Sequence, residues 1–329
     1  MSIHIGPVEI KDPVILAPMS GVTDLPFRRC VKQFGAGLLV SEMIASEAMI
    51  RSCRRMWKKM SGRFDGDWPM SVQLAGCKAE SMAEAAKLNE DQGAAIIDIN
   101  MGCPAKKVVN GYSGSALMRD LEHAKGLITA TVKAVKIPVT LKMRTGWDYD
   151  CRNAPELAKI AEGEGIQLVT VHGRTRNQFY KGSSDWAFIN EVKKNCNLPL
   201  IVNGDIVDGE TIDQSLKMSG ADGVMIGRGT YGKPWLISQA IHYMKTGEWP
   251  ADPTLEVQLA TIIDHYDDMI EHYGVETAIK MARKHFGWYT KGLPSSAEFR
   301  NGINRMTNPD EVKTALYDFY APLIEQEAA

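Results

Sequence analysis

Residues 96–104 read Ile-Ile-Asp-Ile-Asn-Met-Gly-Cys-Pro. A short apolar run of this kind predicts a buried strand, and the polar Asn100 and the glycine after it indicate a sharp exit from that strand. Pro104 fixes its own φ and restricts Cys103 to an extended backbone. The stretch therefore predicts a strand that ends in a loop presenting a thiol. Free cysteines are most often small buried hydrophobes, so a purely structural Cys103 is the open alternative.

The pattern of an apolar run followed by polar residues recurs along the first three quarters of the chain. Strands are expected at residues 14–17, 38–40, 70–74, 96–99, 139–143, 168–171, 200–202 and 223–226. Helical periodicity separates them, for example at 79–92, 122–135, 155–164 and 211–219. Alternating strands and helices predict an α/β protein with a parallel sheet, and eight such units in roughly 230 residues predict a closed (β/α)8 TIM barrel. An open doubly wound sheet is the alternative, which fewer strands would suit better.

The sequence changes in character at residues 247–253, Gly-Glu-Trp-Pro-Ala-Asp-Pro, which read as a linker with two prolines. After it, helices are expected at 254–273, 275–290 and 309–326, with a break at 292–296. The predicted organisation is a catalytic barrel over residues 1–245 followed by a small all-helical C-terminal domain over residues 246–329.

The bulk properties narrow the class of protein. The chain has 329 residues, 44% of them hydrophobic, and a net charge of −2, so any attraction to nucleic acid must be local. Six cysteines without paired spacing predict reduced thiols, no metal site and a cytoplasmic location. The sequence has no basic start followed by an apolar run and no apolar run of about 18 residues, so neither a signal peptide nor a membrane span is expected. Nothing indicates an obligate dimer, so a monomer is expected.

Polar side chains follow nearly every predicted strand. In a TIM barrel the chemistry lies at the C-terminal ends of the strands. The residues at those ends are Pro18, Met19, Glu42, Gln73, Asn100, Lys142, Arg144, His172, Arg174, Asn203, Asp205, Gly227 and Arg228. Helix capping and loop solvation account for a few of them, such as Asp205 and Glu42. The rest predict a polar site at one end of the barrel.

The last two predicted strands carry a phosphate signal. Residues 227–232, Gly-Arg-Gly-Thr-Tyr-Gly, match G-x-G-x-x-G, but they follow the eighth strand, whereas a Rossmann fingerprint follows the first. Barrels commonly bind phosphate with the loops after strands seven and eight. Gly204, Gly227 and Arg228 therefore predict a phosphate site, with glycines that serve only tight turns as the alternative.

A flavin suits the remaining groups. Lys142 is a cation suited to an anionic ring, and Gln73 and Asn100 are suited to hydrogen-bond a heterocycle edge. One phosphate, one polar-edged ring and negative charge on the reduced ring describe flavin mononucleotide (FMN). A structural ion pair is the alternative for Lys142.

The helical segment is basic in its middle. Lys280, Arg283, Lys284, Lys291, Arg300 and Arg305 are interleaved with His285, Phe286, Trp288, Tyr289 and Phe299. Basic groups contact phosphates and aromatic faces stack on unpaired bases, so the pattern indicates RNA binding. A solvated helix face over an aromatic core is the alternative. A second basic run, formed by Arg51, Arg54, Arg55, Lys58 and Lys59, has an exposed helix as its alternative.

These motifs resemble those of the tRNA-dihydrouridine synthases. The matching stretches are residues 17–24 (APMSGVTD), 71–76 (SVQLAG), 98–108 (DINMGCPAKKV), 114–118 (GSALM), 141–147 (LKMRTGW), 171–176 (VHGRTR), 203–206 (NGDI) and 226–229 (IGRG). Residues 282–289, Ala-Arg-Lys-His-Phe-Gly-Trp-Tyr, resemble the bacterial B-type branch in particular. The resemblance covers nearly the whole chain in order. Two sites depart from the family pattern. Ser20 stands where the family more usually has alanine, and residues 109–112 lack the basic residues that the family often has there.

The resemblance implies an FMN-containing barrel followed by a helical tRNA-binding domain. It implies that the flavin is bound by Pro18, Met19, Ser20, Gln73, Lys142, His172, Asn203, Gly204, Asp205, Gly227 and Arg228. Cys103 would be the catalytic acid, and the substrate would be bound by Asn100, Arg144, Arg174, Lys280, Arg283, Lys284 and Arg300. NADPH would reduce the flavin before tRNA binds.

The expected activity is reduction of the C5–C6 bond of specific tRNA uridines to 5,6-dihydrouridine. A hydride would reach C6 and Cys103 would protonate C5. One rival is an FMN barrel that acts on a free pyrimidine, as in dihydroorotate dehydrogenase-like proteins, which leaves residues 254–329 without a role. Another is a non-enzymatic RNA-binding protein on a relic barrel, which predicts loss of Cys103 or Lys142, although both are present.

Overall fold

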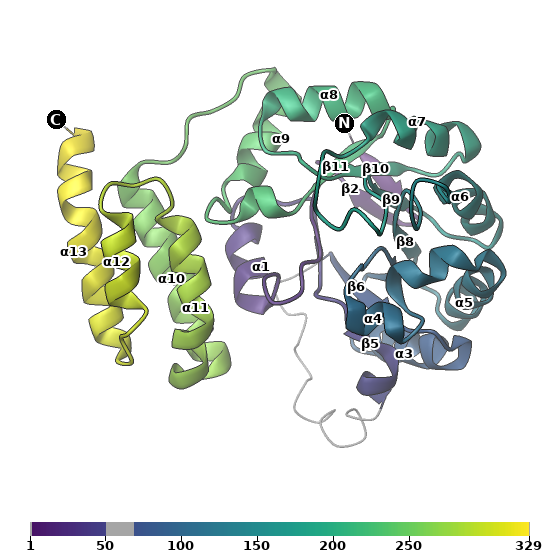
Figure 1. The fold of residues 1–329 in the computed structure, drawn as a ribbon, viewed down its shortest axis with the longest axis horizontal. Helices are drawn as coiled ribbons and strands as arrows, with labels where there is room; N and C mark the ends of the chain where they lie inside the picture. Colours follow the sequence, from purple (N-terminus) through teal and green to yellow (C-terminus); the bar gives the residue numbers. More distant parts are fainter. Residues whose placement is uncertain (1, 51–68, 329) are drawn as a thin grey trace.

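Eight parallel strands close into a barrel in the computed structural model, which describes residues 2–50 and 69–328. The strands are β3 (Val14–Leu16), β4 (Leu38–Val40), β6 (Met70–Ala75), β7 (Ile96–Met101), β8 (Val139–Arg144), β9 (Val169–His172), β10 (Leu200–Asn203) and β11 (Gly223–Ile226). Each pairs with the next along the chain, β11 returns to β3, and β4 pairs with β6. The predicted TIM barrel is therefore confirmed, and the open sheet is excluded (Figure 1).

The alternation of side chains along each strand decides what faces the barrel interior. On β7, Ile97 and Ile99 belong to the core between the strands and the surrounding helices, whereas Ile96 belongs to a separate cluster inside the barrel. Asp98 and Asn100 share the parity of Ile96, so they also point inward. Apolar side chains fill the lower interior, and polar ones fill the end where the strands exit.

Helices surround the barrel and carry the chain back between strands (Figure 1). They are α1 (Leu25–Lys32), α3 (Ala79–Asp91), α4 (Lys106–Asn110), α5 (Leu121–Ala134), α6 (Ala154–Gly163), α7 (Trp186–Asn195), α8 (Gly209–Ser219) and α9 (Leu236–Thr246), with 3-10 turns at Gly114–Arg119 and Arg228–Thr230. The sequence determines their ends locally. Asp208 and Thr211 form a capping box at the start of α8, and Gly220 ends it with a φ of 67°.

The structure has an antiparallel hairpin at the N-terminus that was not among the predicted elements. It consists of β1 (Ile3–Ile5) and β2 (Val8–Ile10). Ile3, Ile5 and Ile10 join the interior cluster with residues from the N-terminal ends of the barrel strands, such as Ile96 and Ile201. The hairpin therefore covers the end of the barrel opposite the strand exits. β1 (Ile-His-Ile) and β2 (Val-Glu-Ile) each have a polar residue between two apolar ones, so neither forms the apolar run that marked the barrel strands. The two-residue β5 (Ile44–Ala45) also went unpredicted.

Four helices follow the barrel: α10 (Leu255–Tyr273), α11 (Val275–Tyr289), α12 (Ser296–Ile303) and α13 (Pro309–Ala328). They surround a hydrophobic cluster of their own, and α10 packs against α1 of the barrel (Figure 1). Three of them match the prediction, and α12 went unpredicted because it begins directly after the Pro294–Ser295 break. None of the described helices is long and apolar enough to cross a membrane. The basic run at 51–59 lies outside the described residues.

The hairpin suggests a stability test. Ile5 is fully buried, so we expect Ile5→Ala to lower the free energy of unfolding by about 2–5 kcal/mol, the usual cost of truncating a buried aliphatic side chain. His4 is exposed on the same strand, and His4→Ala should change that free energy by less than about 0.5 kcal/mol. Urea denaturation measures both. Equal effects of the two substitutions would contradict the packing of β1 into the barrel.

Candidate active site

A ladder of buried polar side chains crosses the barrel interior beneath the strand exits. Thr140 Oγ1 donates to Asp98 Oδ1, Gln73 Nε2 donates to Asp98 Oδ2, and Asn100 Nδ2 donates to Gln73 Oε1, each at 2.6 Å. Burial raises the pKa of Asp98, and the two hydrogen bonds that it accepts oppose this rise. The ladder fixes the orientation of the Asn100 amide, because its nitrogen must point at Gln73.

The oxygen of that amide holds the Cys103 loop. Asn100 Oδ1 accepts from the backbone N–H groups of Gly102 at 3.1 Å and of Cys103 at 2.9 Å. On the other side, the Cys103 carbonyl accepts from the backbone N–H of Ser115 at 3.1 Å and from its hydroxyl at 2.8 Å. The half-buried thiol therefore stands on a loop that is hydrogen-bonded on both sides.

Lys142 brings a positive charge to the same end of the barrel. Its Nζ donates to Asn203 Oδ1 at 3.0 Å, and Asn203 Nδ2 donates to the Met225 carbonyl at 2.7 Å. Burial and then the charge of Arg144 lower the pKa of Lys142, and Asp98 and Cys103 oppose this, so that the pKa is about 8. At neutral pH the side chain is therefore still mostly an ammonium.

Arg144, expected to bind substrate, is buried and already has protein partners. Its Nε donates to the Gly102 carbonyl at 2.7 Å, and its Nη1 donates to the carbonyls of Thr175 at 2.9 Å and Phe179 at 2.8 Å. The guanidinium thus ties the loop of Cys103 to the loop that follows β9. Burial lowers its pKa to about 10, which leaves it charged at neutral pH.

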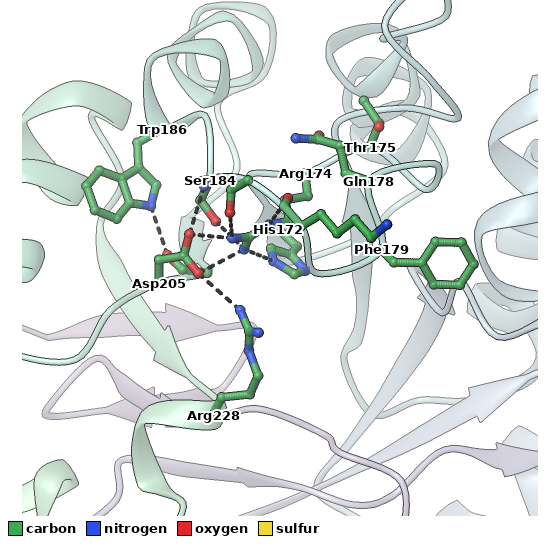
Figure 2. A network of polar contacts seen from close by, with 12 residues as sticks. His172, Arg174, Thr175, Gln178, Phe179, Ser184, Trp186, Asp205 and Arg228 are labelled. Atoms are coloured by element: carbon green, nitrogen blue, oxygen red, sulfur yellow. Dashed lines mark hydrogen bonds and ion pairs between the residues drawn. The ribbon is translucent and has the colours of Figure 1, made fainter.

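Arg174 is the centre of a second network, shown in Figure 2. Its guanidinium is 2% exposed and donates to both oxygens of Asp205, at 2.9 and 2.6 Å. Arg228 donates to Asp205 Oδ1 at 3.1 Å. Burial alone would raise the pKa of Asp205, but the hydrogen bond from Arg174 and the charges of both arginines hold it below its ordinary value. Arg174 therefore lies beneath the site, with the more exposed Arg228 nearer to solvent.

His172 lies between the two networks. Arg174 Nη1 is 3.3 Å from its Nε2, and the ring is buried. Burial, and then the charges of Arg144 and Lys142, lower the pKa of His172 well below its ordinary value. The imidazole is therefore neutral at physiological pH and interacts through hydrogen bonds.

The loops after β10 and β11 form a backbone cradle beside these side chains. Gly204 has a φ of 112°, and a Cβ there would lie 2.6 Å from the His172 ring, so only glycine fits. A Cβ on Gly227 would touch Met19 and Ala17 at 3.4 Å. Among the described residues, the N–H groups of Gly204 and Asp205 donate to no protein acceptor. These free donors and the half-exposed Arg228 suit an anionic ligand.

The structure brings together the barrel residues that the sequence singled out, but not the four basic residues of the helical segment. Lys280 Nζ pairs with Glu276 at 2.7 Å, and Arg300 Nη1 donates to Ser296 Oγ at 3.2 Å. Arg283 Nη2 lies 3.5 Å from the Met306 carbonyl. Only Lys284 reaches the barrel, where it donates to the Gly21 carbonyl. Pro18 and Met19 are half-buried and Ser20 is exposed.

Tyr180 is a residue of the mouth that the sequence analysis missed. Its ring is 54% exposed and lies 5.0 Å from the Arg228 guanidinium and 5.6 Å from that of Arg144. The sequence signal that could have indicated it is an aromatic residue four positions after the Arg-Thr-Arg stretch of residues 174–176.

Comparison with known proteins agrees with the arrangement. The dihydrouridine synthase (Dus) family model matches residues 15–323. The chain belongs to the dihydrouridine synthase family. The family resemblance expected from the motifs is thereby confirmed.

Several relatives of this dihydrouridine synthase family member match along almost their full length. A "Probable tRNA-dihydrouridine synthase" of Rickettsia bellii is 58% identical, covering 99% of this chain and 100% of that protein. A protein of the same name from Rickettsia conorii is 55% identical, covering 98% of each. The "tRNA-dihydrouridine synthase B" of Xanthomonas axonopodis pv. citri is 47% identical, covering 98% of this chain and 96% of that protein. A solved FabK mutant from Thermotoga maritima is 14% identical with a TM-score of 0.41, covering 68% of this chain and 64% of that one, a likeness too weak to argue from.

The lowered pKa of Lys142 predicts a pH dependence of stability. Between the pKa of about 8 in the folded protein and the ordinary lysine value of 10.5, the unfolded chain binds more protons at this side chain than the folded one. The free energy of unfolding should therefore rise, relative to that of Lys142→Met, as the pH increases through this window. Urea denaturation at several pH values between 7 and 10 measures the difference. A difference that stays constant with pH would show that Lys142 titrates normally.

Proposed function

We propose that this protein is a tRNA-dihydrouridine synthase that reduces the C5–C6 bond of uridine in tRNA, with FMN as its cofactor and NADPH as the reductant. The observation that carries the proposal is the meeting, at one end of the barrel, of a presented thiol, an ammonium and a backbone anion cradle. Membership of the dihydrouridine synthase family supports the reaction class.

The residues present fit FMN. The free N–H groups of Gly204 and Asp205, together with the Arg228 guanidinium, suit its phosphate. Lys142 and Gln73 would lie at the ring, with Pro18, Met19 and Ser20 along its border. His172 and Asn203 would hold the ribityl chain, and Asp205 would act by holding Arg228 in place. When bound and reduced by NADPH, the flavin supplies a hydride to C6 of the uracil.

Cys103 would complete the reduction with a proton. Addition of hydride at C6 leaves negative charge spread over C5 and the C4 carbonyl oxygen, and transfer of the thiol proton to C5 restores a neutral ring. The two hydrogens of the product are thus accounted for. In this role the Cys103 thiol is the general acid, and its S–H hydrogen is the proton transferred. Asn100 orients the thiol through the backbone of its loop.

The developing charge needs a cation at the barrel mouth. Lys142 is charged at neutral pH and sits one strand away from Asn100, with which it pairs across β7 and β8. Fixed charges of this kind stabilise a transition state without reorganisation. Arg144 contributes indirectly, because its guanidinium is committed to backbone carbonyls. His172 is neutral and contributes through hydrogen bonds.

The helical segment gives a reason to favour tRNA over a free pyrimidine. A base in folded RNA is stacked or paired, so the uridine must be extruded to enter a barrel, and the rest of the RNA needs a surface. In the proposed organisation residues 246–329 form that surface, and Lys280, Arg283 and Arg300 contact phosphates. An enzyme for free pyrimidines would leave this segment without a role.

The proposed activity has a direct test. Purified protein should carry a flavin absorption band, and with NADPH it should form dihydrouridine in tRNA isolated from cells that lack the gene, measured by mass spectrometry of nucleosides. Deletion of the gene should remove dihydrouridine from particular tRNA positions. A protein that reduces free uracil as fast as tRNA would instead be a free-pyrimidine enzyme.

The role of Cys103 is tested by substitution. We expect Cys103→Ala to lower dihydrouridine formation by about 10²–10⁴-fold, because the general acid is lost, and to leave flavin reduction by NADPH intact. Cys151→Ala is the matched control, since Cys151 is also free and half-buried but takes no part in the proposed reaction. Stopped-flow absorbance follows the first half-reaction and mass spectrometry the second. A parallel loss of NADPH oxidation would make Cys103 a folding or cofactor residue.

A further inference from the structure

One turn of helix α11 touches the loops on both sides of the candidate cofactor site. The first is the loop of residues 18–24 after β3, and the second is the loop of residues 227–232 after β11. These loops are neighbours, because β3 and β11 pair in the barrel and Gly227 lies against Met19. The C-terminal helices therefore meet the barrel at the mouth that the proposed function assigns to FMN.

The contact with the first loop is made by Lys284. Its Nζ donates to the Gly21 carbonyl, at a glycine with a φ of 77°. Within this loop the N–H groups of Val22 and Thr23 both donate to the Met19 carbonyl, at 2.9 and 3.0 Å. Holding Gly21 therefore holds the turn that presents Met19 to the site.

Two neighbouring contacts support the same docking. Tyr273, at the end of α10, donates from its hydroxyl to Asp24 Oδ2 at 3.0 Å. The ring of His285, next to Lys284 on α11, lies 5.6 Å from that of Phe27 on α1. The first loop is thus anchored from the C-terminal helices at more than one point.

The contact with the second loop is made by Trp288, one turn beyond Lys284. Its ring stacks on that of Tyr231, with centroids 4.1 Å apart and planes 11° apart. Gly232 packs directly on the Trp288 backbone with a φ of 71°, and a Cβ at that position would collide with the Trp288 carbonyl. The last glycine of the G-x-G-x-x-G match therefore serves the contact with α11, and not the phosphate.

From these contacts we infer that Lys284 and Trp288 are positioning residues for the cofactor site. The inference rests on the proposed function for the identity of the cofactor, and it changes the role of Lys284. This side chain was expected to bind tRNA together with Lys280, but its ammonium is committed to a barrel carbonyl. Lys280 lies one turn earlier on the exposed face of α11, where its ammonium donates to the exposed carboxylate of Glu276.

The two lysines provide a matched pair for the test. Lys284→Met keeps the aliphatic stem and removes the ammonium. We expect the Kd of the apoprotein for FMN to rise about fivefold, the low end of the usual coupling between a positioning contact and a binding site. Lys280→Met should leave that Kd unchanged. In tRNA binding, Lys280→Met should reduce the dependence of log K on log salt by roughly 0.7–0.9, whereas Lys284→Met should leave it unchanged. Lys284→Arg should restore FMN affinity.

Hydrogen exchange supplies a readout that does not depend on FMN. In Lys284→Met we expect faster exchange in the peptide covering residues 18–24, with the barrel strand β8 unaffected. Three results for Lys284→Met would each overturn the inference. The first is unchanged exchange together with unchanged FMN affinity, and the second is a reduced salt dependence of tRNA binding. The third is faster exchange throughout the barrel. If the wild-type protein binds no FMN, the proposed function fails, but the exchange of residues 18–24 still decides whether Lys284 positions the loop.

Discussion

The side-chain amide of Asn100 is the interaction on which the site depends. Its nitrogen is committed to Gln73 at the end of a buried ladder, which leaves its oxygen pointing at the backbone of Cys103. The hydrogen-bonded barrel interior thereby fixes the position of the Cys103 loop and its thiol. An aspartate at this position would lack the donor for Gln73, and a leucine would leave buried polar groups unpaired, a loss that typically costs about 1–3 kcal/mol per group.

The arginines show how a polar site is assembled inside a barrel. Arg144 and Arg174 are almost completely buried, and each is satisfied by carbonyls or a carboxylate from loops that follow different strands. A guanidinium has five donors in a fixed plane, so it can hold several loops at once. The two buried guanidinium groups therefore hold the loops of the site in place from within the barrel, while Lys142 and Arg228 supply positive charge at its mouth.

The barrel and most of its polar site were predictable because both follow from local pattern. Each strand is an apolar run that ends in a polar residue, and the alternation along β7 places Asp98 and Asn100 inward without any knowledge of their neighbours. The partners of Arg144 and Lys284 were not predictable in this way. Both donate to backbone carbonyls that only the folded chain brings near, and a carbonyl carries no sequence signal. The N-terminal hairpin was missed because each of its strands has a polar residue between two apolar ones and therefore lacks the apolar run that marked the barrel strands.

That hairpin has a consequence for how the enzyme is used. Among the described residues, Ile3, Ile5 and Ile10 pack against the far end of the barrel, whereas the cofactor cradle and the Cys103 loop both lie at the end where the strands exit. In the proposed activity the electron donor and the nucleic acid would both approach that end, so each would have to leave before the other could bind.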